Sequence, residues 1–250
     1  MEHILSLSYG KDSLACLGSI EKLGLPLDRI IHAEIWATDT IPADLPPMVE
    51  FKTKADKIIK ERYGITVEHV CSTNIDGIKG DKITFEDGFY HVLNSGKYAG
   101  SIKGFPMQQG QWCQKLKLSA LKTANDIFYS KRQRGNRVGE IIGFPMIGAC
   151  ELQRALKVSP IRKAPKNCIS YIGIAYDEPK RFKTLSDTKI SPLVMAEWTE
   201  SKCYDWCKQN DLLSPIYENT KRGGCWFCPN QPVEQLRLLR KNYPDCGNCF

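Results

Sequence analysis

The sequence predicts an α/β fold, a doubly wound parallel sheet with a small cysteine-rich C-terminal substructure. Within the first 70 residues, the segments alternate in the order strand, helix, strand, helix, strand. The strand-like segments are short apolar runs, which is typical of parallel strands buried on both faces. The length of 250 residues suits one such domain with an addition. Alternating elements of this kind build a parallel sheet covered by helices.

Each element of this first part follows from a local pattern. The first strand is an apolar run, and the helix after it ends at Gly24 and Pro26. The second helix carries apolar residues at helical spacing from Met48 onward and ends at Gly64. Strands are therefore expected at 3–8, 29–36 and 65–70, and helices at 14–23 and 48–63.

The rest of the chain divides into a duplicated middle and a cysteine-rich end. The tetrapeptide Gly-Phe-Pro-Met at 104–107 recurs 39 residues later, so the middle reads as a segmental duplication of 89–122 in 128–161. Further on, a β-prone run covers 169–175, a helix capped by Thr199 covers 199–207, and another helix covers 233–241. We expect an α/β domain at 1–198 and a cysteine-rich region at 199–250.

The composition is that of an ordinary globular protein. Apolar residues make up 42% of the chain, and no apolar run approaches the roughly 20 residues that span a bilayer. The N-terminus lacks the pattern of a secretory signal, so we expect a cytoplasmic protein with no membrane partner. In a reducing compartment, the 11 cysteines indicate metal ligands or redox thiols. The net charge of +7 suits a nucleotide or nucleic acid as partner.

The segment Ser-Tyr-Gly-Lys-Asp-Ser at 8–13 lies where the first strand ends and the first helix begins. Backbone amides at a helix start and the helix dipole attract anions. Gly10 allows a phosphate to approach closely, and Lys11 supplies a cation. The hydroxyls of Ser8 and Ser13 are further donors, and Asp12 suits magnesium binding or helix capping. The segment is neither a Walker loop nor a dinucleotide-binding fingerprint, but its position predicts a phosphate-binding loop.

Cys225 and Cys228 form a C-x2-C knuckle, preceded by two glycines and followed by a proline. Thiolates at this spacing converge on one metal ion or one cluster edge, although a redox dithiol has the same spacing. Spacing alone nominates Cys246 and Cys249 as partners in a zinc-like pattern. The predicted helix at 233–241 carries the chain away from the knuckle, and few residues remain to bring Cys246 and Cys249 back to it. Cys207, whose helix joins the knuckle by a loop, is therefore an alternative ligand.

The segment at 8–13 resembles the pyrophosphate loop, usually Ser-Gly-Gly-Lys-Asp-Ser, of the adenine nucleotide α-hydrolase superfamily, the PP-loop ATP pyrophosphatases. Within it, the chain is similar to the phosphoadenylyl-sulfate (PAPS) reductase-like family, including phage-borne and DNA-phosphorothioation relatives. One departure is Tyr9, which replaces the middle glycine, so the loop keeps its shape only if tyrosine tolerates that backbone. The other matching residues are Thr38-Asp39-Thr40, Trp112-Cys113 with Leu116-Lys117, Ile172-Gly173-Ile174, Asp177-Glu178, Arg181 and Gly224-Cys225-Trp226-Phe227-Cys228-Pro229.

The resemblance implies a Rossmann-like nucleotide-binding domain and roles for the matched residues. From the residues alone, the alternative role for Asp39 is structural, as the first residue of an Asx turn before Pro42. By the resemblance, catalytic roles fall to Lys11, Asp12 and Arg181, and nucleotide binding falls to Ser8, Gly10, Lys11, Asp12, Ser13 and Asp39. Contacts to a second anionic group or substrate fall to Lys117, Arg154, Lys157, Asp177, Glu178 and Arg181.

The same resemblance implies a metal centre next to the nucleotide. Cys113 matches the middle cysteine that joins a late C-x2-C around a [4Fe–4S] cluster in related reductases, and Cys150 is its duplicate. Cys113, Cys207, Cys225 and Cys228 are thus the implied ligands. All-thiolate ligation favours the cluster, with Zn²⁺ as its rival. Three other cysteines, Cys16, Cys71 and Cys168, are expected to fill the hydrophobic core. The histidines His3, His32, His69 and His91 form no set with the spacing of metal ligands or of a catalytic triad, and His3 and His69 are expected to be structural.

The leading functional interpretation is an enzyme that splits ATP, with Mg²⁺, into AMP and pyrophosphate to activate an acceptor for sulfur transfer. A cysteine desulfurase or thiol carrier would then be a partner, and a nucleic acid is a candidate acceptor. The alternative is a sulfonucleotide (PAPS or APS) reductase in which tail residue Cys246 or Cys249 attacks sulfur. A third interpretation is a cluster-bearing nucleic-acid-binding module with a vestigial loop.

Overall fold

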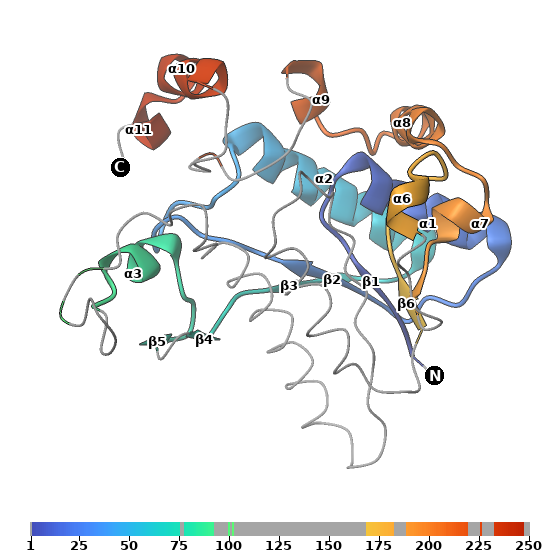
Figure 1. Cartoon of the computed structure of the whole chain (residues 1–250), viewed down its shortest axis with the longest axis horizontal. Helices are drawn as coiled ribbons and strands as arrows, with labels where there is room; N and C mark the ends of the chain where they lie inside the picture. The colour runs from blue at the N-terminus through green and yellow to red at the C-terminus, as the bar shows by residue number, and fades with distance from the viewer. Residues whose placement is uncertain are drawn as a thin grey trace, which may run out of the picture.

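The computed structural model describes residues 2–75, 78–92, 100, 102, 169–182, 189–219, 226 and 233–247. Its centre is a five-stranded sheet in the order β3-β2-β1-β6-β7, with every neighbouring pair parallel. β1 lies in the middle, between β2 and β6 (Figure 1). The strands are β1 (His3–Ser6), β2 (Arg29–Ala33), β3 (Val67–Val70), β6 (Ile169–Tyr171) and β7 (Lys189–Ile190).

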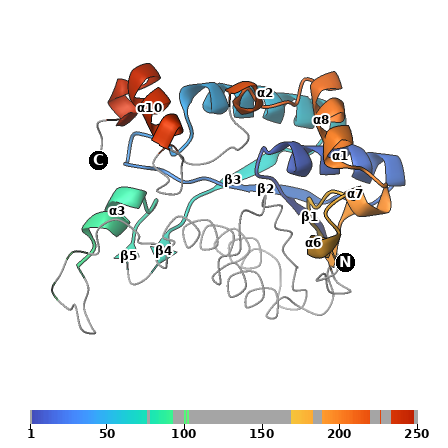
Figure 2. The same ribbon diagram turned by 45° about the horizontal axis from the view of Figure 1, so that its top comes forward.

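The two long helices, α1 (Lys11–Leu23) and α2 (Pro46–Tyr63), lie over one face of the sheet, and α8 (Glu200–Gln209) packs on α1 (Figures 1 and 2). The short α7 (Pro192–Met195) adjoins α1 as well. One hydrophobic core joins these elements, because apolar side chains of the strands and of the helices pack together. Its members include Ile4, Leu5, Leu14, Leu17, Ile30, Ile31, Ile59, Leu193, Cys203 and Leu212.

Glycines end both long helices, as the sequence predicted. Gly24 follows α1 with a φ of 63°, and Gly64 follows α2 with a φ of 70°. In this left-handed conformation, each glycine amide donates back to carbonyl oxygens of the last helical turn. The predicted cap of α8 is also present, because the hydroxyl of Thr199 accepts a hydrogen bond from the amide of Lys202.

Smaller elements lie beyond the sheet. β4 (Asn74–Ile75) and β5 (Ile78–Lys79) pair antiparallel, and α3 (Phe85–Tyr90) begins with a capping box between Thr84 and Asp87. The other short helices are α6 (Pro179–Phe182), α9 (Ile216–Asn219), α10 (Val233–Asn242) and α11 (Pro244–Gly247). A second hydrophobic cluster comprises Ile35, Ala37, Ala43, Ile83, Phe85, Trp226 and Leu239, with Tyr243 and Cys246 packed against it.

The α/β class with a parallel sheet is confirmed, and strands that run outward from β1 in both directions give a doubly wound order. The first helix begins three residues before its predicted start, at Lys11. The sequence missed β7, the β4–β5 pair, α3 and α6, which are too short to show a period. Most of the duplicated middle, 93–99, 101 and 103–161, lies outside the described residues. No helix in the described ranges is long and apolar enough to cross a membrane.

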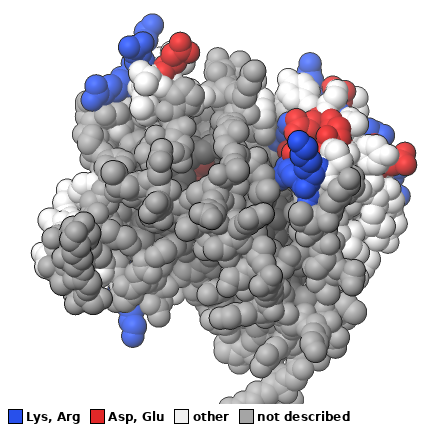
Figure 3. Space-filling model, in the orientation of Figure 1, with Lys and Arg blue, Asp and Glu red and all other residues white. Residues whose placement is uncertain are grey.

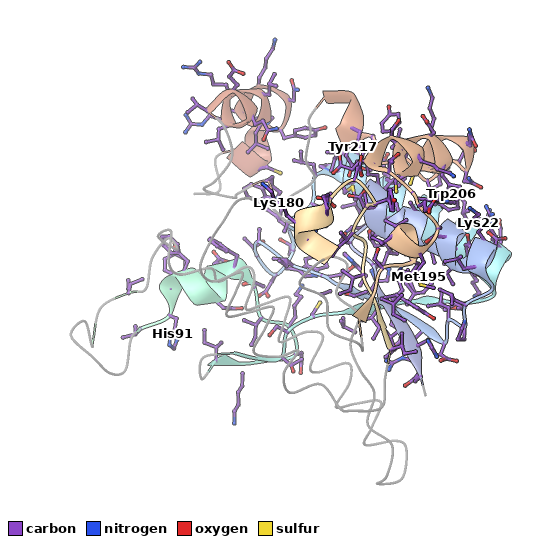
Figure 4. All side chains as sticks on the ribbon, turned by 45° about the vertical axis from the view of Figure 1, so that its right-hand side comes forward. Lys22, His91, Lys180, Met195, Trp206 and Tyr217 are labelled. Atoms are coloured by element: carbon purple, nitrogen blue, oxygen red, sulfur yellow. The ribbon has the colours of Figure 1, made fainter. Side chains whose placement is uncertain are left out.

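The division of the chain at residues 198 and 199 stays a prediction. α8, which lies C-terminal to that boundary, packs on α1, which lies N-terminal to it. At Gly18 of α1 there is no room for a side chain, because the indole of Trp206 of α8 occupies that space. Trp206 is labelled in Figure 4. A Cβ added at Gly18 would lie 2.3 Å from the indole, closer than any real contact. Gly18 is therefore needed for α8 to pack against α1.

We predict that Gly18→Ala lowers the free energy of unfolding by about 1–3 kcal/mol, the usual cost of an extra methyl in a packed contact. Trp206 has little freedom to move, because it also contacts Trp198 and the guanidinium of Arg62. Chemical denaturation measures the change. Gly80→Ala is the control, since a Cβ at Gly80 would meet only an ordinary contact at 3.6 Å. Equal stability of the two variants would contradict this packing.

Candidate functional site

The loop at 8–13 crosses the carboxyl edge of the sheet at its midpoint. β1 ends at Ser6 and α1 begins at Lys11. β2 pairs with one side of β1 and β6 pairs with the other, so the strand order reverses direction at this place. In open α/β sheets, ligands bind outside the carboxyl ends of the strands at such a switch point. The predicted loop therefore occupies the position where this fold offers a binding site.

The two serines of the loop hold its shape. The amide and the hydroxyl of Ser8 both donate to the hydroxyl oxygen of Ser13, at 3.3 and 3.0 Å. The hydroxyl of Ser13 donates in turn to the carbonyl oxygen of Gly10, at 2.9 Å. These bonds join the two ends of the loop. The two serines thus stabilise the conformation of the loop, whereas the sequence indicated them only as hydroxyl donors to phosphate.

A tyrosine distant in sequence meets the start of α1. Gly10 precedes the helix and supplies no side-chain cap. The amide of Lys11 donates to the hydroxyl of Tyr217, at 3.0 Å, so this side chain of α9 takes the place of a cap (Figure 4). Burial raises the pKa of Tyr217, which keeps the hydroxyl neutral. The oxygen of Tyr217 therefore occupies an acceptor position at the helix N-terminus.

The ammonium of Lys11 is engaged by carboxylates. Its Nζ lies 2.6 Å from Oδ1 of Asp12 and 3.6 Å from Oε2 of Glu200. Burial disfavours the charge of Lys11, but Asp12 outweighs that effect and the pKa of Lys11 is raised. The pKa of Asp12 is also raised, because burial and the charges of Glu200 and Glu178 outweigh the attraction of Lys11. Lys11 thus stays cationic, in a setting with an excess of carboxylates.

The end of β6 lies directly against the first turn of α1. A Cβ added at Gly173 would lie 3.2 Å from the carbonyl carbon of Asp12 and 3.2 Å from the amide nitrogen of Ser13. Only a residue without a side chain lets the two backbones approach so closely. The Ile172-Gly173-Ile174 motif therefore brings the chain that follows β6 up to the loop.

Asp177, Glu178 and Arg181 follow that approach, on and before α6. Nη1 of Arg181 lies 2.5 Å from Oε2 of Glu178, so the two side chains form an ion pair. Glu178 also accepts a hydrogen bond from the amide of Ala175, at 3.3 Å. Asp177 accepts a bond from the amide of Glu200, at 3.0 Å, which ties this segment to the start of α8. Acidic and basic side chains gather over α6 and α8 at the upper right of Figure 3. These three predicted residues thus lie at the same edge as the loop.

Asp39 lies on an exposed part of the loop after β2. The turn there is formed by Thr38, whose hydroxyl accepts bonds from the amides of Thr40 and Ile41, at 3.4 and 3.1 Å. Lys82 donates to the backbone carbonyl oxygen of Asp39, at 2.6 Å. Thr38 therefore has the turn-forming role that the sequence analysis offered to Asp39.

Cys207 lies in the packed contact between α8 and α1. Its thiol is fully buried and donates to the carbonyl oxygen of Lys11, at 3.2 Å. Burial and the neighbouring Cys203 raise the pKa of Cys207. Cys16, across the contact on α1, is likewise a buried thiol with a raised pKa. Both thiols thus belong to the hydrophobic core between α1 and α8.

A polar network behind the loop, which runs from the buried Tyr9 to the exposed His69, was not predicted. Tyr9 has a φ of 55°, a conformation that costs a non-glycine residue roughly 1–2 kcal/mol. Its side chain is fully buried, its hydroxyl donates to Oδ1 of Asp56, and Nε2 of His69 lies 3.2 Å away. His69 bridges two carboxylates, with Nε2 2.7 Å from Asp56 and Nδ1 2.8 Å from Glu34. Tyr9 therefore adopts the left-handed backbone conformation at the position where the related loops have glycine, with its side chain held by these contacts.

A second branch of this network passes through His32. Its Nδ1 must donate to the carbonyl oxygen of Leu7, at 2.8 Å, so its Nε2 accepts from Nζ of Lys52, at 2.8 Å. Lys52 pairs with Asp44 and lies 5.4 Å from the centre of the Tyr9 ring. The residues come from separate elements, 19 or more positions from the loop, and no local motif indicated them.

The cysteine knuckle is described only at Trp226. The indole of Trp226 donates to the carbonyl oxygen of Pro42, at 2.9 Å, and its amide donates to that of Ala43, at 3.0 Å. Cys246, half-buried on α11, packs against the hydrophobic cluster that contains Trp226. In the described ranges, no three His, Cys, Asp or Glu residues are grouped so as to hold a metal ion. The other predicted residues lie outside those ranges: Cys113, Lys117, Cys150, Arg154, Lys157, Cys225, Cys228 and Cys249.

Comparison with known proteins gives a distant likeness among solved structures. No protein-family model matches the chain, and no curated protein does. Among solved structures, the chain is similar to "U34-tRNA thiolase NcsA from Methanococcus maripaludis with its [4Fe-4S] cluster", at a TM-score of 0.38 and 15% sequence identity. The alignment covers 99% of this chain and 69% of that chain. A likeness this distant does not define the family of the chain.

We predict that stability falls as the pH rises through about 9. Hydrogen bonds to Asp56 and then to Glu34 raise the pKa of His69 from 6.5 to about 9. Since the folded state holds this proton more tightly, the stabilisation is complete below pH 6.5 and is lost as the pH passes about 9. Melting temperatures between pH 7 and pH 10 should drop by a few degrees. His69→Gln is the control, because it keeps a donor but does not titrate; an identical pH profile for both proteins would exclude His69.

Proposed function

We propose that the loop at 8–13 binds the phosphates of an adenine nucleotide, and that the protein splits ATP into AMP and pyrophosphate to activate an acceptor for sulfur transfer. The observation that carries this proposal is the position of the loop, between the middle strand and α1, where the strand order reverses. The loop also combines a lysine with an aspartate, as in the ATP-cleaving proteins it resembles.

The first turn of α1 would provide the donors for phosphate. The amide of Lys11 donates to the Tyr217 hydroxyl, so a phosphate oxygen that binds this amide takes over the acceptor position of that hydroxyl. The ammonium of Lys11 would turn from Asp12 toward the phosphates. There, it would stabilise the charge that develops as the bond between the α- and β-phosphates breaks.

Asp12 fits a magnesium ion. Its carboxyl lies at the loop beside Glu200 and Glu178, and the repulsion among these groups contributes to its raised pKa. Magnesium in such sites is held by one or two carboxylates together with phosphate oxygens. The ion would neutralise phosphate charge, and Asp12 would hold it after releasing Lys11. Arg181, at the same edge, is then a candidate for a further anionic group, together with Lys117, Arg154 and Lys157.

The reductase alternative requires a cysteine that is free to reach the nucleotide. Of the two tail candidates, Cys246 packs against the second hydrophobic cluster from the short helix α11. A thiol held in this way favours a structural or ligating role over that of a mobile nucleophile. We therefore retain sulfonucleotide reduction as the second candidate function, carried by Cys249 rather than Cys246.

For the metal centre, we propose ligation by Cys225 and Cys228 with Cys246. Trp226 lies between the first two in sequence and belongs to the cluster against which Cys246 packs. The thiol of Cys207 fits this role less well, because it is fully buried and donates to the carbonyl oxygen of Lys11. Cys113 or Cys249 would complete a [4Fe–4S] cluster or a zinc site. The net charge of +7 is compatible with a nucleic acid acceptor, and a cysteine desulfurase or thiol carrier would supply sulfur.

We predict that Lys11→Ala weakens ATP binding by about 1.5–3 kcal/mol, the scale of a charge-assisted contact. Calorimetry in the presence of magnesium measures the affinity, and release of pyrophosphate measures turnover. The control is Lys22→Ala, which removes a lysine from the opposite end of the same helix, away from the loop (Figure 4). Equal affinity of wild type and Lys11→Ala for every adenine nucleotide would refute the proposed phosphate site. ATP binding without pyrophosphate release would favour a nucleic-acid-binding module.

We predict that Cys246→Ser, like Cys225→Ser, lowers the bound metal, while Cys207→Ser does not. The expected reason is that the thiol of Cys207 is buried in the contact between α8 and α1, where it donates to the carbonyl oxygen of Lys11. Anaerobic purification followed by iron, sulfide and zinc analysis gives the stoichiometry. Cys71→Ser is a matched control in a half-buried cysteine. Loss of metal in Cys207→Ser with full metal in Cys246→Ser would restore the ligand set of Cys113, Cys207, Cys225 and Cys228.

A further inference from the structure

Tyr9 is the one residue of the loop whose side chain points into the protein as a long, buried anchor. In the described ranges, three non-glycine residues have a positive φ: Tyr9, Glu197 and Asp211. Glu197 and Asp211 follow the ends of α7 and α8, where such a conformation commonly ends a helix. Tyr9 instead lies before a helix, between Ser8 and Gly10. Its unusual conformation therefore needs an explanation other than a helix end.

The side chain of Tyr9 is fixed from several directions. Its hydroxyl donates to Asp56 of α2 and lies 3.2 Å from Nε2 of His69 of β3. The ring of His32 meets the Tyr9 ring edge-on, with centroids 4.7 Å apart. Lys52 lies 5.4 Å from the ring centre. A residue held on every side keeps a strained backbone conformation that it would otherwise leave.

His69 in turn fixes Asp56. Both ring nitrogens of His69 face carboxylates, Nε2 facing Asp56 and Nδ1 facing Glu34, so the ring is doubly protonated when both bonds form. The titratable groups that face Tyr9 and His69 come from five segments. They are Asp44 before α2, Lys52 and Asp56 of α2, His32 of β2, Glu34 after β2, and His69 of β3.

We propose that Asp56 and His69 are positioning residues, which act through the Tyr9 hydroxyl to hold the loop at 8–13 in the conformation that binds phosphate. This inference rests on the proposed function, because it assigns a task to groups behind the same loop. Ser8, Gly10 and Lys11 flank Tyr9, so a movement of its backbone displaces the donors of the loop. Neither Asp56 nor His69 touches the nucleotide in this arrangement.

The test compares Tyr9→Phe, which removes only the hydroxyl, with Tyr63→Phe. Tyr63 is the C-terminal residue of α2, and its hydroxyl also donates to a carboxylate, that of Glu21, at 3.4 Å. ATP dissociation constants are measured by calorimetry at pH 7.5, with melting temperatures in parallel. We expect Tyr9→Phe to weaken ATP binding about tenfold, the equivalent of one hydrogen bond to a charged group, and Tyr63→Phe to leave it within about twofold.

His69→Gln and the double variant Tyr9→Phe/His69→Gln show whether the histidine acts through the tyrosine. His69→Gln alone should also weaken ATP binding, and it should have no further effect once the Tyr9 hydroxyl is absent. Wild type should bind ATP more weakly at pH 9.5 than at pH 7.5, because His69 loses its proton over this range. Tyr9→Phe should lack this difference. Lys11 does not confound the comparison, since its pKa is raised above 10.5.

Each result has a definite meaning. A wild type that binds no adenine nucleotide overturns the proposed function and this inference together. A wild type that binds ATP, with a Tyr9→Phe variant that melts lower but binds equally well, overturns the inference alone and makes the anchor purely structural. Additive effects of the two substitutions would show that His69 acts independently of Tyr9, which overturns the positioning chain.

Discussion

The first turn of α1 is the point on which the rest of the structure depends. Its backbone is contacted from four directions: by Tyr217 at the amide of Lys11, by Cys207 at the carbonyl of Lys11, by Gly173 at Asp12, and by Tyr9 from the preceding loop. A helix start leaves amides that need acceptors, and here no residue of the loop caps them with a side chain. Tyr217, which is 206 residues further along the chain, supplies the acceptor for the amide of Lys11. The sheet order makes such contacts feasible, because every parallel strand ends at this edge.

The charges at this edge differ from the charge of the whole chain. The net charge is +7, yet the described groups closest to Lys11 include Asp12 and Glu200, and Arg181 is paired with Glu178. The described groups around Lys11 therefore do not reflect the positive surplus of the chain, and the net charge does not locate the loop. A phosphate that enters such a site meets carboxylates as well as a lysine, and a cation that accompanies it removes this conflict. The acidic surroundings thus strengthen the case for magnesium as part of the proposed nucleotide complex.

The sequence predicted what depends on local pattern. The three strands and two helices of the first 70 residues, the glycines that end the helices and the Thr199 cap are all present, since each depends on neighbours within a turn or two. The loop at 8–13 also lies where the motif predicted it, between a strand and a helix. Tyr217, Glu200 and Asp56 were missed, because their roles come from contacts between distant segments. The burial of Cys207 was missed for the same reason, because it is set by how α8 packs on α1.

The exchange of glycine for tyrosine in the loop has two opposing effects. A glycine adopts a φ near 55° without strain, but it leaves the loop untied to the rest of the protein. Tyrosine accepts strain of roughly 1–2 kcal/mol in return for a buried ring and a hydrogen bond to a carboxylate, which together outweigh it. The loop then moves only when α2 and β3 move with it, because Asp56 and His69 hold the same hydroxyl. In this chain, the backbone conformation of the loop at Tyr9 is therefore coupled to a charged network behind the sheet edge, because the Tyr9 hydroxyl belongs to both.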